Sequence, residues 1–391
     1  MNNNIFAFSA TETGYNHTKI NKVCEDASDF YDDEKMHICV VADGHGSDNY
    51  PRTEFGSKFA VDAAIKNVIE FVNTAEKSQV INDAENNFER MNQLAKSILR
   101  SWYESVEEDY NKKPFTEKEL EKVSDKYKNR YLSENIEERK VEKAYGCTLI
   151  IYVITDDYSF GMQIGDGKCV LIDENGQFLE PIPWDDDCQL NVTTSICDDD
   201  AIDEFRFYIS DKMPTAVFIG SDGIDDSYAN EEELYALYRS ILKIFIEHGD
   251  EVGKSEIREY LPVLTKRGSG DDVSMGLIIN QKRAKSISSV FEMQIEVFKL
   301  TEELQDKKRK KDIVTEKALR LSSRIKKWKD IVEMPSEEVV QVNDLIEEER
   351  NLSIQIQEIE KKLVNLSENQ KNINFVDEAD IHKSNKQQEE A

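Results

Sequence analysis

The chain has 391 residues, 39% of them hydrophobic, and 50 Lys and Arg residues stand against 79 Asp and Glu residues, a formal net charge of -29. Nucleic acids and anionic lipids are normally bound by net basic surfaces, so this charge argues against both classes of partner. The longest apolar stretch is too short to span a bilayer and no signal-peptide pattern opens the chain, so we expect a cytoplasmic protein without a membrane partner.

Strand and helix patterns alternate along the first 150 residues. The β-branched run Met36–Ala42 predicts a strand. Apolar residues at three-to-four spacing then predict two amphipathic helices, one over residues 55–68 and one over 88–102. A capping-box pattern at Thr116 begins a charged segment, about 112–143, which we interpret as a solvated helical extension.

Three predicted strands follow in close succession, and connections this short favour antiparallel neighbours. Residues 183–214 are acidic and irregular, so we expect a loop or a small acidic lobe there. The interspersed strands and helices predict sheets covered by helices. The elements expected after residue 145 are strands at 146–155, 158–164, 168–172, 215–220 and 273–279, and helices at 231–248 and 256–264.

The composition changes after residue 282, where Lys, Arg, Glu and Gln dominate and glycine almost disappears. Leu345, Leu352, Ile359 and Leu366 recur every seven residues, which is the spacing of a coiled-coil seam. We therefore predict three segments. They are a globular domain over 1–282, a helical coiled-coil region over 283–376 and a disordered tail over 377–391.

Several apolar strands are punctuated at one end by an aspartate beside a glycine. One such aspartate is usually a turn residue, but four of them predict a shared site if the strand ends converge. Clustered carboxylates must repel one another, take up protons or share cations. An oxygen-only ligand set favours Mg²⁺ or Mn²⁺, and a pair of such ions would bridge and activate a hydroxide for attack on phosphorus. The four motifs are Asp43-Gly44, Gly165-Asp166-Gly167, Asp222-Gly223 and Gly270-Asp271.

The ordered motifs of the chain resemble those of the PPM (PP2C-type) protein phosphatases, and the Gly14-Tyr15-Asn16-His17 stretch is similar to the bacterial branch of that family. The resemblance implies a protein Ser/Thr phosphatase with an α+β fold, a four-layer α-β-β-α sandwich. It also implies two Mg²⁺ or Mn²⁺ ions, a third in some relatives, a phosphorylated protein substrate and a cognate Ser/Thr kinase. The matching motifs are Glu25-Asp26-Ala27, Asp43-Gly44-His45-Gly46, Gly146-Cys147-Thr148, Gly165-Asp166-Gly167, Ser221-Asp222-Gly223-Ile224-Asp225-Asp226 and Gly270-Asp271-Asp272-Val273-Ser274.

The resemblance assigns metal ligands residue by residue. Asp43 would bridge both ions, and the Gly44 carbonyl would bind one of them. Asp222 and Asp271 would complete the shell of the other ion. The positions of the weaker third ion correspond to Asp166 and Asp226.

The same resemblance assigns roles around the ions. Glu25 and Asp26 would orient metal-bound water, and His45 would protonate the leaving oxygen of the substrate. The chain departs from many relatives at Asn21, where they place an arginine that clamps the phosphate. Lys19, Lys22 and His17 are the candidates to replace that arginine.

Two other interpretations compete with an active phosphatase. One is a weakly active or inactive scaffold that keeps the phosphatase fold and assembles partners, or itself, through the coiled coil. The other takes the acidic clusters at 185–187 and 198–200 as calcium sites, but they lack the alternating ligands and central glycine of a calcium loop.

Overall fold

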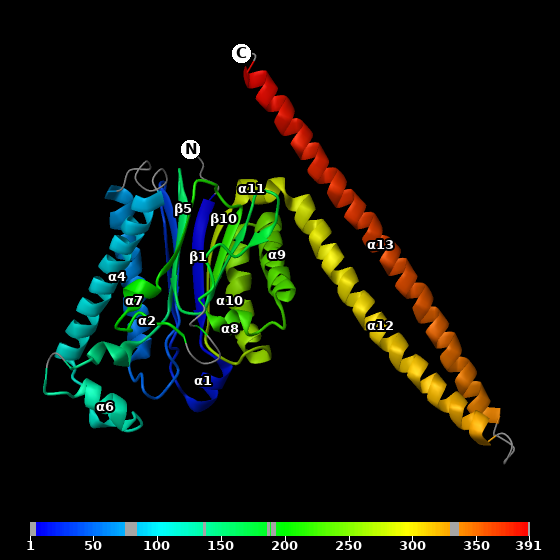
Figure 1. Ribbon diagram of the computed structural model, residues 1–391, viewed down its shortest axis with the longest axis horizontal. Helices are drawn as coiled ribbons and strands as arrows, with labels where there is room; N and C mark the ends of the chain where they lie inside the picture. Colours follow the sequence, from blue (N-terminus) through cyan, green and yellow to red (C-terminus); the bar gives the residue numbers. More distant parts are fainter. Residues whose placement is uncertain are drawn as a thin grey trace. The chain divides into compact units, whose positions relative to one another are not determined.

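A computed structural model describes residues 5–74, 84–135, 138–185, 188, 193–328 and 336–389 (Figure 1). Its contacts divide the chain into two compact units, Met1–Ser288 and Ser289–Ala391. Within the described ranges, every helix is too short or too polar to cross a membrane.

The first unit is built on two five-stranded sheets in which every neighbouring pair is antiparallel. The first sheet has the order β1 (Ile5–Glu12), β10 (Val273–Asn280), β9 (Ala216–Gly220), β6 (Lys168–Ile172) and β7 (Phe178–Leu179). The second has the order β2 (Ala27–Asp32), β3 (Met36–Ala42), β4 (Leu149–Thr155), β5 (Ser159–Ile164) and β8 (Arg206–Ser210).

Strand β3 shows how the sheets are covered on both faces. Its side chains alternate, so that Ile38 and Val40 belong to the core facing the helices while Cys39 and Val41 belong to the core between the sheets. Burying one such side chain is worth roughly 1.5–3 kcal/mol. Because both faces of the strand are buried, its sequence is continuously apolar instead of alternating between apolar and polar residues.

Two pairs of long helices form the outer layers of this unit (Figure 1). Helices α2 (Thr53–Thr74) and α4 (Ala84–Lys112) pack on the sheet that contains β3, where the buried Trp102 ring donates a hydrogen bond to the Gly56 carbonyl. Helices α9 (Glu231–His248) and α10 (Asp250–Arg267) cover the other sheet. The Phe218 and Tyr238 rings, whose centroids lie 4.2 Å apart, join β9 to α9. The predicted four-layer α-β-β-α sandwich is confirmed.

Short elements complete the first unit. They are α1 (Tyr15–Ile20), α5 (Glu117–Leu120), α6 (Asp125–Tyr131), the 3-10 helix η1 (Val141–Tyr145), α7 (Ala201–Glu204), α8 (Asp222–Asp225) and α11 (Gln281–Ser286).

The second unit contains two long helices, α12 (Ser288–Trp328) and α13 (Ser336–Glu389). Ion pairs join them, with Lys308 Nζ 2.8 Å from Glu360 Oε1 and Lys311 Nζ 3.3 Å from Glu349 Oε1. Ile359 of the predicted seam is buried. Helix α13 continues to Glu389, through the segment for which the sequence predicts disorder.

Three sequence predictions about the first unit are wrong in informative ways. Strand β6 was expected beside β5, but it pairs with β9 because the connection at 165–167 crosses to the other sheet. The acidic segment 183–214 contributes the strand β8. The charged segment 112–143 is more than a solvated extension, since Leu120, Val123 and Tyr131 are buried there.

Candidate metal centre

The predicted acidic residues lie at the ends of four different strands. Asp43 follows β3, Asp166 lies between β5 and β6, Asp222 begins α8 directly after β9, and Asp271 precedes β10. Asp226 follows the single turn of α8. Each of these connections returns the chain toward the same end of the sandwich, which places their carboxyl groups within electrostatic reach of one another.

Asp43 and Asp222 are the centre of this cluster. Burial, the charges of Asp26 and Asp222, and a hydrogen bond to Asp222 raise the pKa of Asp43 well above its usual range. Burial also raises the pKa of Asp222, and the charges of Asp166, Asp271 and Asp226 act in the same direction. Carboxylates held this close together favour either a bound proton or a shared cation.

Asp26 adds a second buried carboxyl group to the cluster. It is 4% exposed, and burial raises its pKa to about 8, with the Asp272 and Asp222 charges adding to the effect. The Ser221 hydroxyl donates to its Oδ2 over 2.8 Å, and Ser221 also accepts from the Ser274 amide. These bonds fix Asp26 between the starts of α8 and β10.

The backbone of Asp43 is held by the motif at 146–148. The Asp43 amide donates to Thr148 Oγ1 over 3.1 Å, and the Thr148 amide donates to the Asp43 carbonyl over 2.8 Å. A β-bridge joins Gly44 to Cys147. A side chain at Gly44 would place its Cβ only 2.4 Å from the Glu25 carbonyl oxygen, so the close approach of these two loops requires glycine.

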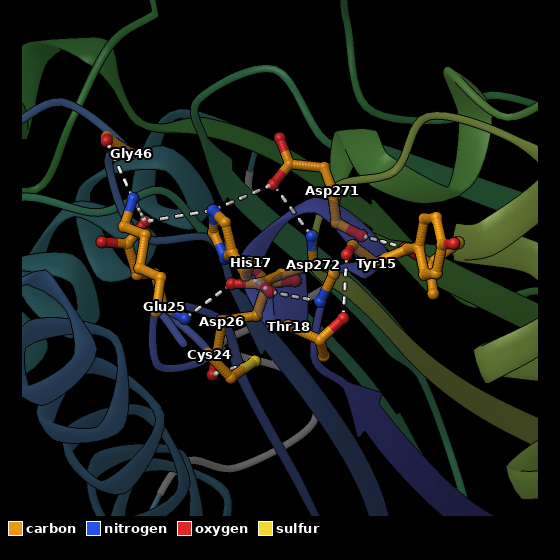
Figure 2. A network of polar contacts seen from close by, with 12 residues as sticks. Tyr15, His17, Thr18, Cys24, Glu25, Asp26, Gly46, Asp271 and Asp272 are labelled. Carbon is orange, nitrogen blue, oxygen red and sulfur yellow. Dashed lines mark hydrogen bonds and ion pairs between the residues drawn. The ribbon is translucent and has the colours of Figure 1, made fainter. Parts of the chain in front are cut away.

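Asp272 anchors the N-terminal loop to the site (Figure 2). It is buried, and it accepts hydrogen bonds from the Gly14 amide at 2.6 Å, the Glu25 amide at 2.6 Å and His17 Nδ1 at 2.9 Å. The sequence prediction gave no role to Asp272, because the pattern at 270–274 does not show which of its two adjacent aspartates turns inward.

His17 points its second ring nitrogen toward the carboxylates (Figure 2). Its Nε2 lies 3.8 Å from Asp271 Oδ1 and 4.0 Å from Glu25 Oε2. Together with Asp272, His17 and Asp271 offer ligand atoms within 4.8 Å of one another, a grouping compatible with a metal ion among the described residues. The sequence named His17 only as a substitute for the missing arginine.

Lys22 brings a positive charge to the same loop. Its Nζ lies 2.6 Å from Glu25 Oε2 and 3.0 Å from the Gly46 carbonyl oxygen. Asn21, at the position of the arginine in many relatives, instead ends α1 with a left-handed φ of 54° and is exposed. Of the candidates named from the sequence, Lys22 and His17 therefore reach the carboxylates.

His45 follows Gly44, and its ring lies against Tyr50 and Gly146. Its ring packs against Tyr50 with centroids 4.7 Å apart, and Gly146 leaves the space that the ring needs. Burial lowers the pKa of His45 to about 4, and the charges acting on the ring are those of Asp198 and Lys143.

Neighbouring side chains engage the described residues Asp185, Asp198 and Asp199 of the acidic clusters that one interpretation took as calcium sites. Asp198 and Asp199 pair with Lys143 and Lys140, each at 3.1 Å, and Asp185 accepts from the Thr194 hydroxyl at 2.7 Å. Asp186 and Asp187 lie outside the described residues.

The sequence model of the family described as protein phosphatase 2C matches residues 13–262, most of the first unit. The chain belongs to the protein phosphatase 2C family. Its enzyme class is protein-serine/threonine phosphatase, as the sequence predicts.

Several of the solved structures found by comparison are bacterial phosphatases. They include a bacterial serine phosphatase (17% identity, 70% of this chain and 97% of that chain, TM-score 0.45) and the serine/threonine phosphatase Stp1 from Staphylococcus aureus (17%, 70% and 94%, 0.44). The Mycobacterium tuberculosis serine/threonine phosphatase PstP/Ppp is a third (13%, 70% and 98%, 0.42). A comparison with curated proteins found no match. The family assignment rests on the sequence match.

The raised carboxyl pKa values predict how metal-free stability depends on pH. Asp26 holds a proton in the folded state up to about pH 8 but loses it near 3.8 when unfolded, so its contribution to stability falls as the pH rises between these values. In EDTA, the melting temperature should therefore fall from about pH 5 to about pH 8, and Mn²⁺ should reduce the fall. In the Asp26→Asn variant, the melting temperature in EDTA should depend less on pH over this range. A parent melting temperature that rises over this range, or an identical slope in Asp26→Asn, would contradict the electrostatic description.

Proposed function

We propose that this phosphatase hydrolyses phosphoserine and phosphothreonine in proteins at the carboxylate cluster around Asp43 and Asp222, with Mg²⁺ or Mn²⁺ as cofactor. The observation that supports this most strongly is the hydrogen-bonded, half-buried Asp43–Asp222 pair with four further acidic side chains acting on it. Such a group of oxygen ligands is stable as anions only beside hard cations. The residues present therefore fit the metal that the family implies.

The ligand positions follow from the cluster. We assign Asp43, the Gly44 carbonyl, Asp222 and Asp271 to two ions, and Asp166 and Asp226 to a third, weaker one. Bound ions would supply an activated water nucleophile and polarise the phosphoryl oxygens. Asp26, fixed by Ser221, and Glu25, held by Lys22, would orient water in the site.

Isosteric removal of charge tests this assignment. Asp43→Asn and Asp222→Asn should each lower Mn²⁺-dependent hydrolysis of p-nitrophenyl phosphate and of a phosphothreonine peptide by about 10³-fold or more, because each removes a charge opposite the ions. Asp62→Asn, on the exposed side of α2, is the control and should retain activity.

The same assay separates the enzyme from the scaffold interpretation. Activity in the parent that both site variants lose supports the phosphatase. Absence of activity in the parent and in all variants would instead favour a scaffold that retains the fold.

His45 is proposed to protonate the leaving oxygen, since it follows Asp43 and Gly44 directly; its pKa, lowered to about 4 by burial, would have to rise when the substrate phosphate binds. A serine or threonine alkoxide needs that proton, whereas p-nitrophenolate leaves without it. His45→Gln should therefore lower kcat for the phosphothreonine peptide by ~10²-fold or more and change p-nitrophenyl phosphate turnover far less. Equal losses on the two substrates would exclude the proton-donor role.

Lys22 is proposed to replace the arginine that many relatives use on the phosphate. Its ammonium lies between Glu25 and the Gly46 carbonyl, where a positive charge can offset the approach of a phosphate dianion to an acidic surface. Lys22→Ala should raise KM for the phosphothreonine peptide by about tenfold, the order expected for a charged hydrogen bond. Lys22→Arg should retain most of the affinity.

The control for Lys22 is Lys19, which contacts Asn16 and the Tyr15 ring instead. Lys19→Ala should leave KM close to that of the parent. If Lys22→Ala and Lys19→Ala have the same KM, the phosphate is held elsewhere.

The remaining proposals concern context. A phosphoprotein substrate implies a cognate Ser/Thr kinase in the same compartment, which we take to be the cytoplasm.

On α13, Val340, Ile346 and Val364 are each more than half exposed, and we propose that this helix supports self-association. If so, sedimentation should show the full chain as an assembly of two or more copies and the chain without residues 289–391 as a single copy.

A further inference from the structure

Helix α6 carries a cluster of basic side chains in a strongly acidic protein. Its sequence, DKYKNRY, exposes Lys126 and Arg130 and leaves Lys128 half-buried. No ion pair of these three side chains occurs among the described residues, and Lys126 and Arg130 both lie 6.0 Å from the centroid of the Tyr127 ring. We call Lys126, Tyr127, Lys128 and Arg130 the α6 basic face.

Two other basic clusters in the chain are neutralised by their neighbours. The run at 307–311 is the longest, yet its Lys308 and Lys311 pair with Glu360 and Glu349 of α13. Lys140 and Lys143 pair with Asp199 and Asp198. Lys126 and Lys128 of the α6 basic face form no ion pair among the described residues, and Arg130 lies near enough to Asp199 to act on it electrostatically.

Helix α6 is fixed to the loop that carries His45. The Tyr131 hydroxyl donates to the Asn49 carbonyl over 2.5 Å, and the Ser124 amide donates to Asn49 Oδ1 over 3.0 Å. The Tyr131 side chain is fully buried. These contacts hold the helix rigidly, so its charges have a defined position relative to the catalytic loop.

A chain of aromatic rings leads from His45 to the basic face. The His45 and Tyr50 centroids are 4.7 Å apart, and those of Tyr50 and Tyr127 are 5.8 Å apart. An extended peptide rises ~3.3 Å per residue, so a substrate leaving the site along this side would reach Lys126 and Arg130 within about five residues of its phosphorylated residue.

We propose that the α6 basic face binds acidic residues of the phosphoprotein substrate within about five positions of the phosphorylated serine or threonine. The proposal rests on the proposed function and adds a specificity determinant to it. Charge complementarity identifies the occupant, because a face of two lysines and an arginine on a chain of net charge -29 attracts an acidic segment and rejects a basic one.

The test compares three phosphothreonine peptides whose flanks, two to five residues from the phosphothreonine, carry Glu, Gln or Lys. The parent should hydrolyse the Glu peptide with kcat/KM about three- to tenfold above the Gln peptide, the order expected for a few solvent-exposed ion pairs. The preference should shrink as salt is added. In each protein, kcat/KM is divided by that for p-nitrophenyl phosphate, which is too small to reach α6.

Charge reversal supplies the matched variants. Lys126→Glu, Lys128→Glu and Arg130→Glu together should abolish or invert the preference for the Glu peptide. The control, with Lys66→Glu, Lys96→Glu and Arg100→Glu on exposed positions of α2 and α4, changes the net charge equally and should keep the preference. The same ratio of Glu to Gln peptide in both triple variants, or a parent preference for the Lys peptide, would overturn the proposal.

A binding measurement separates this inference from the proposed function. Fluorescence anisotropy of the labelled Glu and Gln phosphopeptides on Asp43→Asn protein, with and without the α6 reversal, reports docking without turnover. If the parent hydrolyses p-nitrophenyl phosphate but the Glu and Gln phosphopeptides bind equally well, only the docking proposal is contradicted. If the parent is inactive but the Glu phosphopeptide binds more tightly through the α6 basic face, only the catalytic proposal is contradicted.

Discussion

Mutual repulsion among carboxyl groups at one end of a β-sandwich is the constraint on which the rest of this molecule depends. Burial raises the pKa of Asp43, Asp222 and Asp26, and the charges of neighbouring carboxylates raise each of them further. Without a counterion, such a cluster must hold protons and costs folding free energy. Our proposal is that hard cations relieve this repulsion, which would connect the electrostatics to phosphate chemistry.

The fold meets this constraint with backbone contacts that leave the carboxylates no alternative position. Thr148 closes a pair of hydrogen bonds on Asp43, and Gly44 allows the Glu25 loop to pass within contact distance. On the other side, the Asp272 carboxylate accepts hydrogen bonds from the Gly14 and Glu25 amides and from His17. Asp43 and Asp272 are therefore held by backbone hydrogen bonds at the ends of β3 and β10.

The sequence predicted what depends on local pattern. The strand at Met36–Ala42 and the helix at Glu231–His248 have the predicted bounds, and the aspartate beside glycine at each strand end indicated the cluster. It could not predict that β6 leaves the sheet of β5, because apolar strands in either sheet have the same composition. Nor does spacing show which of two adjacent aspartates, 271 or 272, is buried, since that depends on a contact with Gly14 far away in the chain.

The central claim is that the carboxylates of Asp43 and Asp222 share divalent cations, and diffraction tests it most directly. Crystals of the full chain grown with MnCl₂ and measured near the manganese absorption edge should give anomalous peaks within coordination distance of both side chains, with Asp43 between two ions. Strong anomalous signal elsewhere with no peak at these carboxylates, or an electron density map in which the two side chains point apart, would contradict the account.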